Sequence, residues 1–179
     1  MSAFEPLKVF SPVIAMIAEI SIFGGVTDAQ WETVLPKLDR GTFKKGDAIF
    51  RKDEEPTHIY ILQSGKVELV LADEAVTIEK KRLGPGECFG QVSLMAMHRH
   101  TVTAIAEEDC VIVGLSRHAL IELQKKDIAL FALLMMNVAR ELARRLMLTD
   151  NLLLHYVHTH GEEGKETGNL ASGLWGREN

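Results

Sequence analysis

The residues with the clearest chemical potential lie between Leu83 and Thr101, in the segment LGPGECFGQVSLMAMHRHT. Gly90 can adopt a positive φ and lets the backbone approach a ligand closely. A short helix that begins near Gln91 would direct its free N–H groups at an anion, and a cation across the loop would complete a phosphate site. The simpler alternative is a glycine-rich turn between two strands that binds nothing.

This segment lies within a β-rich region that runs from Arg40 to Ser116. Two apolar runs flank Gln63-Ser64-Gly65, which is a hairpin signal. The predicted strands are 59–62, 66–71, 76–78, 101–106 and 111–115. Many short strands at regular spacing favour a sandwich or a barrel.

Helical patterns flank the β-rich region on both sides. Residues from about Met1 to Leu38 are expected to be helical, with Thr27 as an N-terminal cap. Arg117–Gln124 is predicted as a short helix and Ile128 to about His158 as a long one. The long helix carries a heptad seam, which predicts pairing with another helix. The seam residues are Leu142, Leu146, Thr149, Leu153 and Tyr156.

Composition limits the function classes. The chain of 179 residues is 46% hydrophobic and 25% charged, which is typical of a soluble globular protein. Its net charge of −5 argues against a general polyanion binder, so a phosphate ligand would need a local positive site. Cys88 and Cys110 suggest no disulfide framework, which fits a reducing, cytoplasmic location. We expect two buried small residues, with a redox pair as the alternative.

No targeting signal or membrane span is predicted. Glu5 precedes any cationic run, unlike a secretory leader. The apolar run Pro12–Val26 contains Glu19 and is short for a membrane span. An amphipathic helix over Pro12–Ile22 that packs on the domain is expected, and a membrane-surface helix is the alternative.

The segment around Gly90 resembles the phosphate-binding cassette of the cyclic nucleotide-binding domain family. Family members read Phe-Gly-Glu, a small or apolar pair, a short loop, and then Arg followed by Ser, Thr or Ala. The Glu binds the ribose 2′-hydroxyl and the Arg binds the cyclic phosphate. Here Phe89-Gly90 is followed by Gln91 in place of the Glu, and His100 stands at the Arg position with Thr101 after it.

The resemblance extends from about Phe23 to Leu154. Residues 43–50 look like the family's early turn and strand, although Lys52 stands where a Gly is frequent. Residues 59–67 match its tyrosine-containing hairpin. Residues 143–149 look like the long helix of the bacterial catabolite activator proteins, in which a Thr at the Thr149 position contacts the base across the dimer. A small polar residue that sets coiled-coil register is the alternative for Thr149.

The resemblance implies an α+β fold: a β-sandwich of the jelly-roll type (a double-stranded β-helix) with N-terminal helices and a long C-terminal dimerisation helix. The expected segments are an N-terminal helical segment 1–38, a β-roll 39–126, the long helix 127–158 and a disordered tail 159–179. The implied ligand-binding residues are Phe89, Gly90, Gln91, Val92, Ser93, Arg99, His100, Thr101, Arg145 and Thr149. Gly90 to Val92 would hold the ribose-phosphate, His100 and Thr101 the phosphate, and Arg145 and Thr149 the base.

The two replacements change the electrostatics of the cassette. Gln91 accepts a hydrogen bond without charge, and His100 at an unperturbed pKa of roughly 6.5 is about a quarter charged near pH 7. Together the losses could reach ~3–5 kcal/mol, or roughly 10²–10⁴ in affinity. Arg99 could replace His100 if the loop shifts by one residue, but in a regular strand it would face the other way.

The sequence therefore predicts a stand-alone regulatory sensor module that binds cyclic AMP, cyclic GMP or a related small anion. It would form a homodimer through the long helix and act on an unknown protein partner. The alternative is a dimeric scaffold that kept the fold and lost the ligand. No enzyme, cofactor or metal site is expected, although the histidines at 98, 100, 155, 158 and 160 are candidate ligands. Only residues 156–179 follow the region of resemblance, without a helix-turn-helix pattern, so no direct DNA binding is expected.

Overall fold

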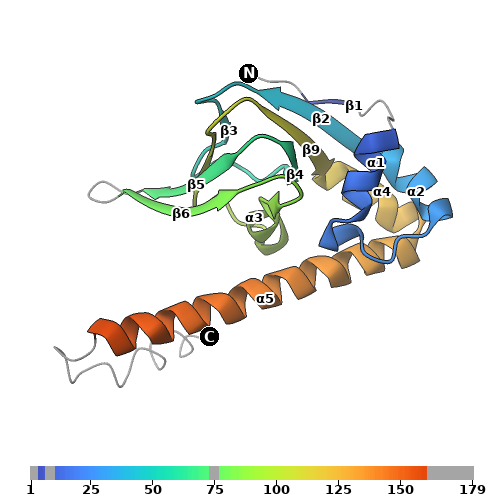
Figure 1. The fold of residues 1–179 in the computed structure, drawn as a ribbon. Coiled ribbons are helices and arrows are strands. Elements are labelled where there is room, and N and C mark those ends of the chain that lie inside the picture. The colour runs from blue at the N-terminus through green and yellow to red at the C-terminus, as the bar shows by residue number, and fades with distance from the viewer. Residues whose placement is uncertain (1–3, 7–10, 73–76, 161–179) are drawn as a thin grey trace. The chain divides into compact units, whose positions relative to one another are not determined.

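The structure is a computed structural model that describes residues 4–6, 11–72 and 77–160 (Figure 1). The chain divides into two compact units, Met1–Ala139 and Arg140–Asn179, and each is described by itself. The expected disordered tail is 159–179; Thr159 and His160 are the last residues of helix α5 (Ile128–His160), and the rest lies outside the described residues. None of the described helices has a stretch long and apolar enough to cross a membrane.

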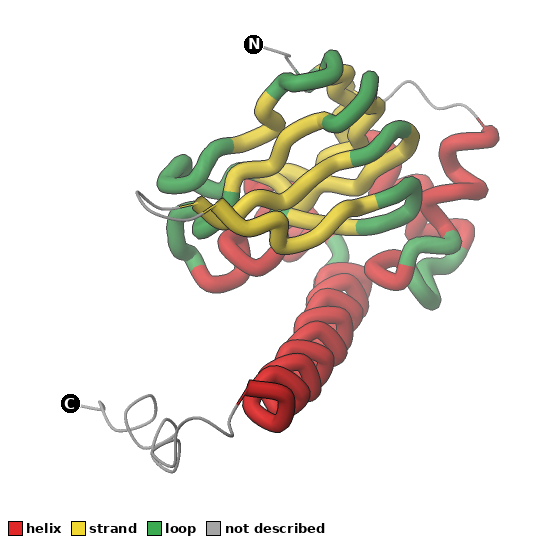
Figure 2. The backbone as a smooth tube through the Cα atoms, turned by 60° about the vertical axis from the view of Figure 1, so that its left-hand side comes forward, coloured by secondary structure: helices red, strands yellow, loops and turns green. Residues whose placement is uncertain are grey.

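The first unit is built on two antiparallel sheets, whose strands are yellow in Figure 2. One sheet has the order β1-β2-β9-β4-β7 and the other the order β3-β8-β5-β6. The strands are β1 (Glu5–Pro6), β2 (Leu38–Phe43), β3 (Ala48–Phe50), β4 (His58–Ser64), β5 (Val67–Ala72), β6 (Thr77–Leu83), β7 (Cys88–Phe89), β8 (Thr103–Ala106) and β9 (Cys110–Ser116). The predicted α+β jelly roll is confirmed.

The helices of the first unit gather mainly at one end of the β-roll, where Figure 1 shows α1, α2 and α4 together. They are α1 (Ser11–Ala18), η1 (Ser21–Phe23), α2 (Asp28–Val34), η2 (Leu35–Lys37), α3 (Gln91–Ala96) and α4 (Arg117–Lys126). Thr27 caps α2 as predicted, because its side chain accepts from the Gln30 N–H while the Gln30 side chain accepts from the Thr27 N–H. Phe23 and Trp31 pack together beneath this cap.

The prediction that residues from about Met1 to Leu38 are helical is wrong near its start, and the last helix ends one residue before the expected limit. Glu5 and Pro6 form β1 and pair with Arg40 and Asp39 of β2, and Leu38 is already the first residue of β2. Pro6 explains the first difference, because a residue that precedes a proline is driven out of the helical region. At the other end, Leu38 is drawn into the ladder with Leu115 of β9.

The core of the β-roll lies between the two sheets and is rich in aromatic rings. Its members are Phe43, Phe50, Tyr60, Leu62, Val67, Leu69, Leu83, Phe89, Ala104, Ala106, Cys110 and Ile112. Cys88 and Cys110 are both buried and free, which confirms the expectation of two buried small residues. Packing of this core fixes the backbone of the segment that carries Gly90 and His100.

The long helix α5 runs from Ile128 to His160 and matches the predicted range within two residues. Its first turns belong to the first unit, with Leu130, Leu134 and Val138 buried. Asn137 donates from Nδ2 to the Ile22 and Gly24 carbonyls at 3.1 and 2.8 Å, which ties α5 to η1. The helix therefore begins directly after the predicted boundary at 127. Its residues up to Ala139 belong to the first unit, and those from Arg140 on belong to the second.

Candidate functional site

The backbone of the cassette is set by Gly90, between β7 and α3. Gly90 has φ +81° and is the residue before the first turn of α3, which begins at Gln91 as predicted. A Cβ at this position would lie 2.7 Å from Cδ2 of Tyr60, so any larger residue would collide with the ring. Both the positive φ and the close approach require glycine here.

Gln91 is buried without a hydrogen-bond partner. Its side chain belongs to a residue only 1% exposed, and neither Oε1 nor Nε2 has a partner among the described residues. Native proteins satisfy the large majority of buried polar side-chain atoms. An amide with both a donor and an acceptor unused is therefore suited to a ligand group that can do both, such as a hydroxyl.

His100 is held from two sides. Its backbone N–H donates to the Glu54 carbonyl at 3.0 Å and its carbonyl accepts from the Asp53 N–H at 2.8 Å. Its ring stacks on Phe50 with the centroids 3.7 Å apart and the planes 11° apart. The residue is 2% exposed, and Nε2 has no partner among the described residues. These backbone bonds also explain why β8 begins at Thr103 and not at the predicted Thr101.

The expected charge on His100 needs correction. Burial lowers the pKa of His100 below its ordinary value of 6.5, and the nearby Glu54 carboxylate opposes this only in part. The ring is therefore less than a quarter charged at pH 7. The sequence pattern could not reveal this, because it does not show that Phe50 covers the ring.

Arg99 does not take the place of His100. Its guanidinium donates to the Asp53 carbonyl at 2.6 Å and pairs with Glu55 at 2.9 Å, on an exposed side chain. The one-residue loop shift that would bring Arg99 into the cassette is absent from the structure. The strand geometry invoked for Arg99 does not apply, because residues 98–100 are not in a strand and β8 begins at Thr103.

The remaining cassette residues differ in exposure. Phe89 and Ser93 are buried, whereas Val92 and Thr101 are exposed. Phe89, Gln91 and His100 are therefore buried in the interior of the first unit. Val92 and Thr101 remain at the surface.

Two aromatic residues that the site prediction left out, Phe50 and Tyr60, pack against Phe89 of the cassette. Tyr60 stacks on Phe89 with centroids 5.2 Å apart, and Phe50 lies 5.4 Å from Tyr60 and 6.0 Å from Phe89. Their signal was present in the sequence, since Phe50 and Tyr60 fall in the two segments that matched the family's early strand and hairpin. Burial raises the pKa of Tyr60, whose hydroxyl lies 3.2 Å from Oγ1 of Thr57.

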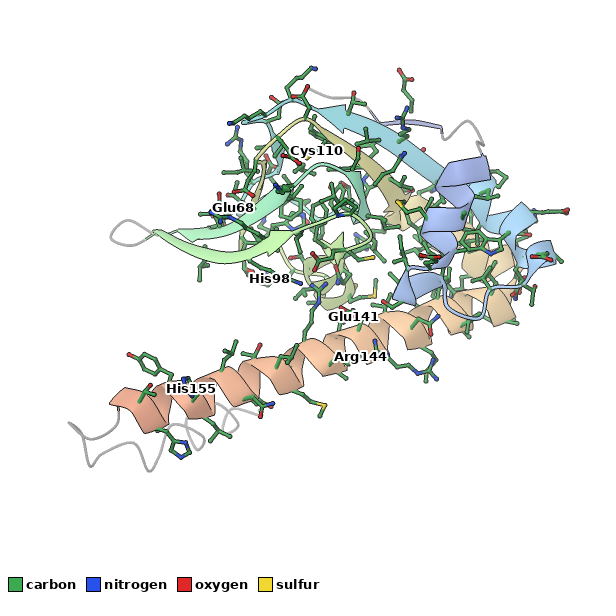
Figure 3. The ribbon with its side chains drawn as sticks, in the orientation of Figure 1. Glu68, His98, Cys110, Glu141, Arg144 and His155 are labelled. Carbon is green, nitrogen blue, oxygen red and sulfur yellow. The ribbon has the colours of Figure 1, made fainter. Side chains whose placement is uncertain are left out.

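The second unit carries the two predicted base-contacting residues. Arg145 donates from Nε to Glu141 at 3.1 Å, and Arg144 reaches the same carboxylate at 3.3 Å (Figure 3). Thr149 donates to the Arg145 carbonyl at 3.0 Å. Large apolar side chains are exposed along this part of α5. They are Leu146, Met147, Leu148, Leu152, Leu153, Leu154 and Tyr156.

Histidines do not form a metal centre in the part of the chain that the structure describes. No three His, Cys, Asp or Glu side chains within it lie close enough to share an ion. His98 instead places Nδ1 2.9 Å from the Arg99 carbonyl.

Comparison with protein families gives a match over residues 40–127, to the family described as the cyclic nucleotide-binding domain. The chain is 30% identical over 132 residues to the cyclic AMP receptor protein of Thermus thermophilus, which covers 72% of this chain and 58% of that protein. It is 37% identical over 84 residues to a cAMP-dependent protein kinase regulatory subunit of Eremothecium gossypii, covering 47% and 18%. The chain therefore spans less than two thirds of both curated relatives.

A solved structure shows the same architecture. The catabolite activator protein of Thermus thermophilus superposes with a TM-score of 0.66 at 29% sequence identity, over 74% of this chain and 61% of that chain.

Proposed function

Because residues 40–127 make this chain a member of the cyclic nucleotide-binding domain family, we propose that its cassette binds cyclic AMP or a related small anionic ligand, and that the bound state regulates a partner. Two relatives are, by name, a cyclic AMP receptor and a regulatory subunit of a cAMP-dependent kinase. The proposed ligand-facing residues of the first unit are Phe89, Gly90, Gln91, Val92, Ser93, His100 and Thr101, and the roles of Arg145 and Thr149 at the base stay predictions.

The observation that carries this proposal is the unpartnered amide of Gln91. An unsatisfied buried polar group costs about 1–3 kcal/mol, and a chain without a use for it would be more stable with an apolar side chain there. The amide stands at the position where the family's carboxylate meets a ribose hydroxyl. A hydroxyl that both donates and accepts would satisfy Oε1 and Nε2 together.

His100 gives the proposed site an unusual electrostatic property. The neutral ring offers Nε2 to a ligand but no charge, since burial lowers its pKa. An anionic phosphate beside the ring favours the protonated form. Binding of a cyclic nucleotide would therefore take up a proton at His100, and the affinity would rise as the pH falls.

The exposed apolar side chains of the second unit support a homodimer through α5. Leu146 is 62% exposed and Leu153 58% exposed, and both belong to the predicted heptad seam. An apolar stripe of this length on a solvated helix is costly unless another surface covers it. A second copy of α5 would cover it with matching spacing, and ligand binding would bias how the two helices pair.

The proposal is tested by restoring the charged ligands. We expect Gln91→Glu with His100→Arg to tighten cyclic AMP binding at least tenfold, which is about 1.4 kcal/mol, in calorimetry of wild type, both single variants and the double variant. The double variant should exceed either single one, because both groups contact one rigid ligand.

His98→Arg is the matched control. It adds the same charge on an exposed side chain two residues from His100, so it should change the affinity little. If the double variant folds, keeps the wild-type assembly in sedimentation and shows no gain, the pocket does not work as a nucleotide site. The alternative of a dimeric scaffold without ligand would then replace the proposal.

A further inference from the structure

A cavity lies next to the cassette, between the N-terminal arm, the turn before β3 and the start of β4. It is a partly open cavity of about 450 Å³, and this volume is within the range of small-molecule sites. Its lining residues are Phe4, Phe43, Asp47, Ala48, Ile49, Arg51, Glu54, Thr57, His58 and Tyr60. None of them belongs to the segment 83–101, so the family's cassette does not account for this space.

Aromatic rings form one wall of the cavity. The ring of Phe4 stacks on His58 with centroids 4.8 Å apart and planes 18° apart, and its centroid lies 5.9 Å from those of both Phe43 and Tyr60. Two glycines make room for it. A Cβ at Gly41 would lie 3.2 Å and one at Gly114 3.1 Å from Cε1 of Phe4. The sequence thus keeps space on the sheet for an aromatic ring in this wall.

Two of the residues that line this cavity carry carboxylates, and each uses one oxygen in a hydrogen bond to its own turn. Asp47 accepts the Lys44 N–H through Oδ2 at 2.7 Å, and Glu54 accepts the Arg51 N–H through Oε2 at 2.9 Å. These bonds fix both side chains on their own turns, and in the described structure Oδ1 of Asp47 and Oε1 of Glu54 make no hydrogen bond. Local backbone bonds therefore orient the carboxylates without using their full capacity as acceptors.

The charge of the lining is negative. Two carboxylates, Asp47 and Glu54, stand against one guanidinium, Arg51. His58 adds little positive charge, since burial lowers its pKa despite the Asp39 carboxylate 3.7 Å away. Aromatic faces attract cations through their quadrupole, so the rings and the carboxylates favour the same sign of ligand.

We propose that this cavity binds an organic cation, an amine with an apolar body, whose ammonium group meets Glu54 and Asp47 and whose carbon framework lies against Phe4, Phe43 and Tyr60. The cavity lies beside the proposed nucleotide site, since Tyr60 stacks on Phe89 and the Glu54 carbonyl accepts the His100 N–H, but the proposal does not depend on nucleotide binding. An anionic ligand is disfavoured, because it would meet two carboxylates and the negative faces of the rings with only Arg51 in support.

The test uses the full chain and 2-phenylethylammonium as the probe, with 2-phenylethanol as its uncharged counterpart. Chemical shift changes of the backbone amides give the affinity and the location together. We expect shifts confined to the lining residues and an affinity for the amine at least about fivefold above that for the alcohol, since a charge-assisted bond replaces a neutral one.

Three variants test the sign of the expected change in amine affinity: two should lower the affinity and one should raise it. Glu54→Gln keeps the acceptor for the Arg51 N–H and should weaken amine binding about fivefold to tenfold. Arg51→Gln removes the competing cation and should tighten it. Phe4→Leu keeps an apolar side chain but removes the ring face, and should weaken it about twofold to fivefold.

Glu32→Gln is the matched control, because it removes an exposed carboxylate of α2 that does not line the cavity. It should leave the amine affinity unchanged. Absence of amine binding to the wild type, equal binding of amine and alcohol, or weaker binding in Arg51→Gln would overturn the proposal. None of these outcomes bears on cyclic AMP binding, so the two proposals fail separately.

Discussion

Two histidines occupy comparable places in the β-roll and differ in one respect. His58 and His100 each stack on a phenylalanine ring, Phe4 and Phe50 respectively, and burial lowers the pKa of both. His58 has partners at both ring nitrogens, with Nδ1 2.8 Å from Oγ1 of Thr57 and Nε2 3.7 Å from Asp39. Nε2 of His100 has none in the described structure.

The difference separates a structural histidine from one that is free to meet a ligand. The polar chain Asp39–His58–Thr57–Tyr60 satisfies itself within the protein. At the cassette, His100 and Gln91 keep unused polar atoms inside the core. Unused buried groups reduce stability, and such a cost is typical of sites that are shaped for binding.

The largest effect is expected where the cassette backbone is forced into its conformation. Gly90→Ala places a Cβ 2.7 Å from the Tyr60 ring at a φ of +81°. The left-handed conformation costs about 1–2 kcal/mol and the overlap adds roughly 1–3 kcal/mol. We expect a loss of about 2–5 kcal/mol in the free energy of unfolding, measured by urea denaturation.

Gly46→Ala is the control for the backbone term alone. Gly46 has a φ of +89°, and nothing lies within 4 Å of a Cβ built there, so only about 1–2 kcal/mol should be lost. Equal losses in the two variants would mean that Tyr60 yields to the added methyl group, and the cassette would then be softer than the contact distance indicates.

The next prediction compares the effects on stability of removing the unpartnered amide of Gln91 and the hydrogen-bonded hydroxyl of Thr57. Gln91→Met replaces the amide by an apolar side chain of similar length, and should stabilise the fold by about 1–2 kcal/mol because an unsatisfied group is removed. Thr57→Val removes the oxygen shared by His58 and Tyr60 and should destabilise it by about 1 kcal/mol. Thermal and urea unfolding of both variants measure the opposite signs.

If Gln91→Met is less stable than the wild type, the contrast between the cassette and the polar chain at His58 is wrong. It would mean that the amide of Gln91 is satisfied in solution, for instance by an internal water, and that the cassette is no more prepared for a ligand than the polar chain at His58. The same variant should also lose affinity for cyclic AMP, which separates a stabilising change from an improved site.

Much of the fold was predictable because its signals are local. The Thr27 cap, the start of α3 at Gln91 and the limits of α5 all follow from short-range patterns, and the structure confirms them. The hairpin predicted around Gly65 is wrong, because β4 and β5 on either side of this turn pair with other strands and lie in different sheets. The errors lie where distant segments decide. Glu5 and Pro6 become a strand only because the edge of β2 is available, and the start of β8 is delayed by bonds from the turn at 53–54 to His100.

The positions of the site residues in the sequence could be predicted, but the contacts that surround their side chains could not. The resemblance identified Gly90, Gln91 and His100 as the positions that matter. It could not show that Phe50 covers His100, that Arg99 is bound by Asp53 and Glu55, or that Gln91 is left without a partner. These properties arise from packing between residues some forty to fifty positions apart, for which a single sequence carries no spacing rule. The roles of Arg145 and Thr149 stay predictions.

The smallest effect tests the two histidines directly by their titration. Because the folded-state pKa of each lies below the ordinary value of 6.5, the unfolded chain binds protons first as the pH falls through about 6.5. Stability should therefore decrease between about pH 7 and the folded pKa, and change no further from these groups below it. Single His→Gln variants at 58 and 100 should each reduce this slope.

Ligand should then act on only one of the two rings. The phosphate of cyclic AMP would favour the charged form of His100, so its pKa should rise in the complex and the affinity should increase as the pH falls, by at most about tenfold per pH unit. His58 is already engaged by Thr57 and Asp39 and should titrate unchanged. Proton NMR of the seven histidines, with the rings assigned by the same two variants, measures both pKa values with and without cyclic AMP. If His58 moves as much as His100, or if neither moves although the nucleotide binds, the unpartnered nitrogen of His100 does not face the phosphate, and the distinction between the two histidines is one of packing alone.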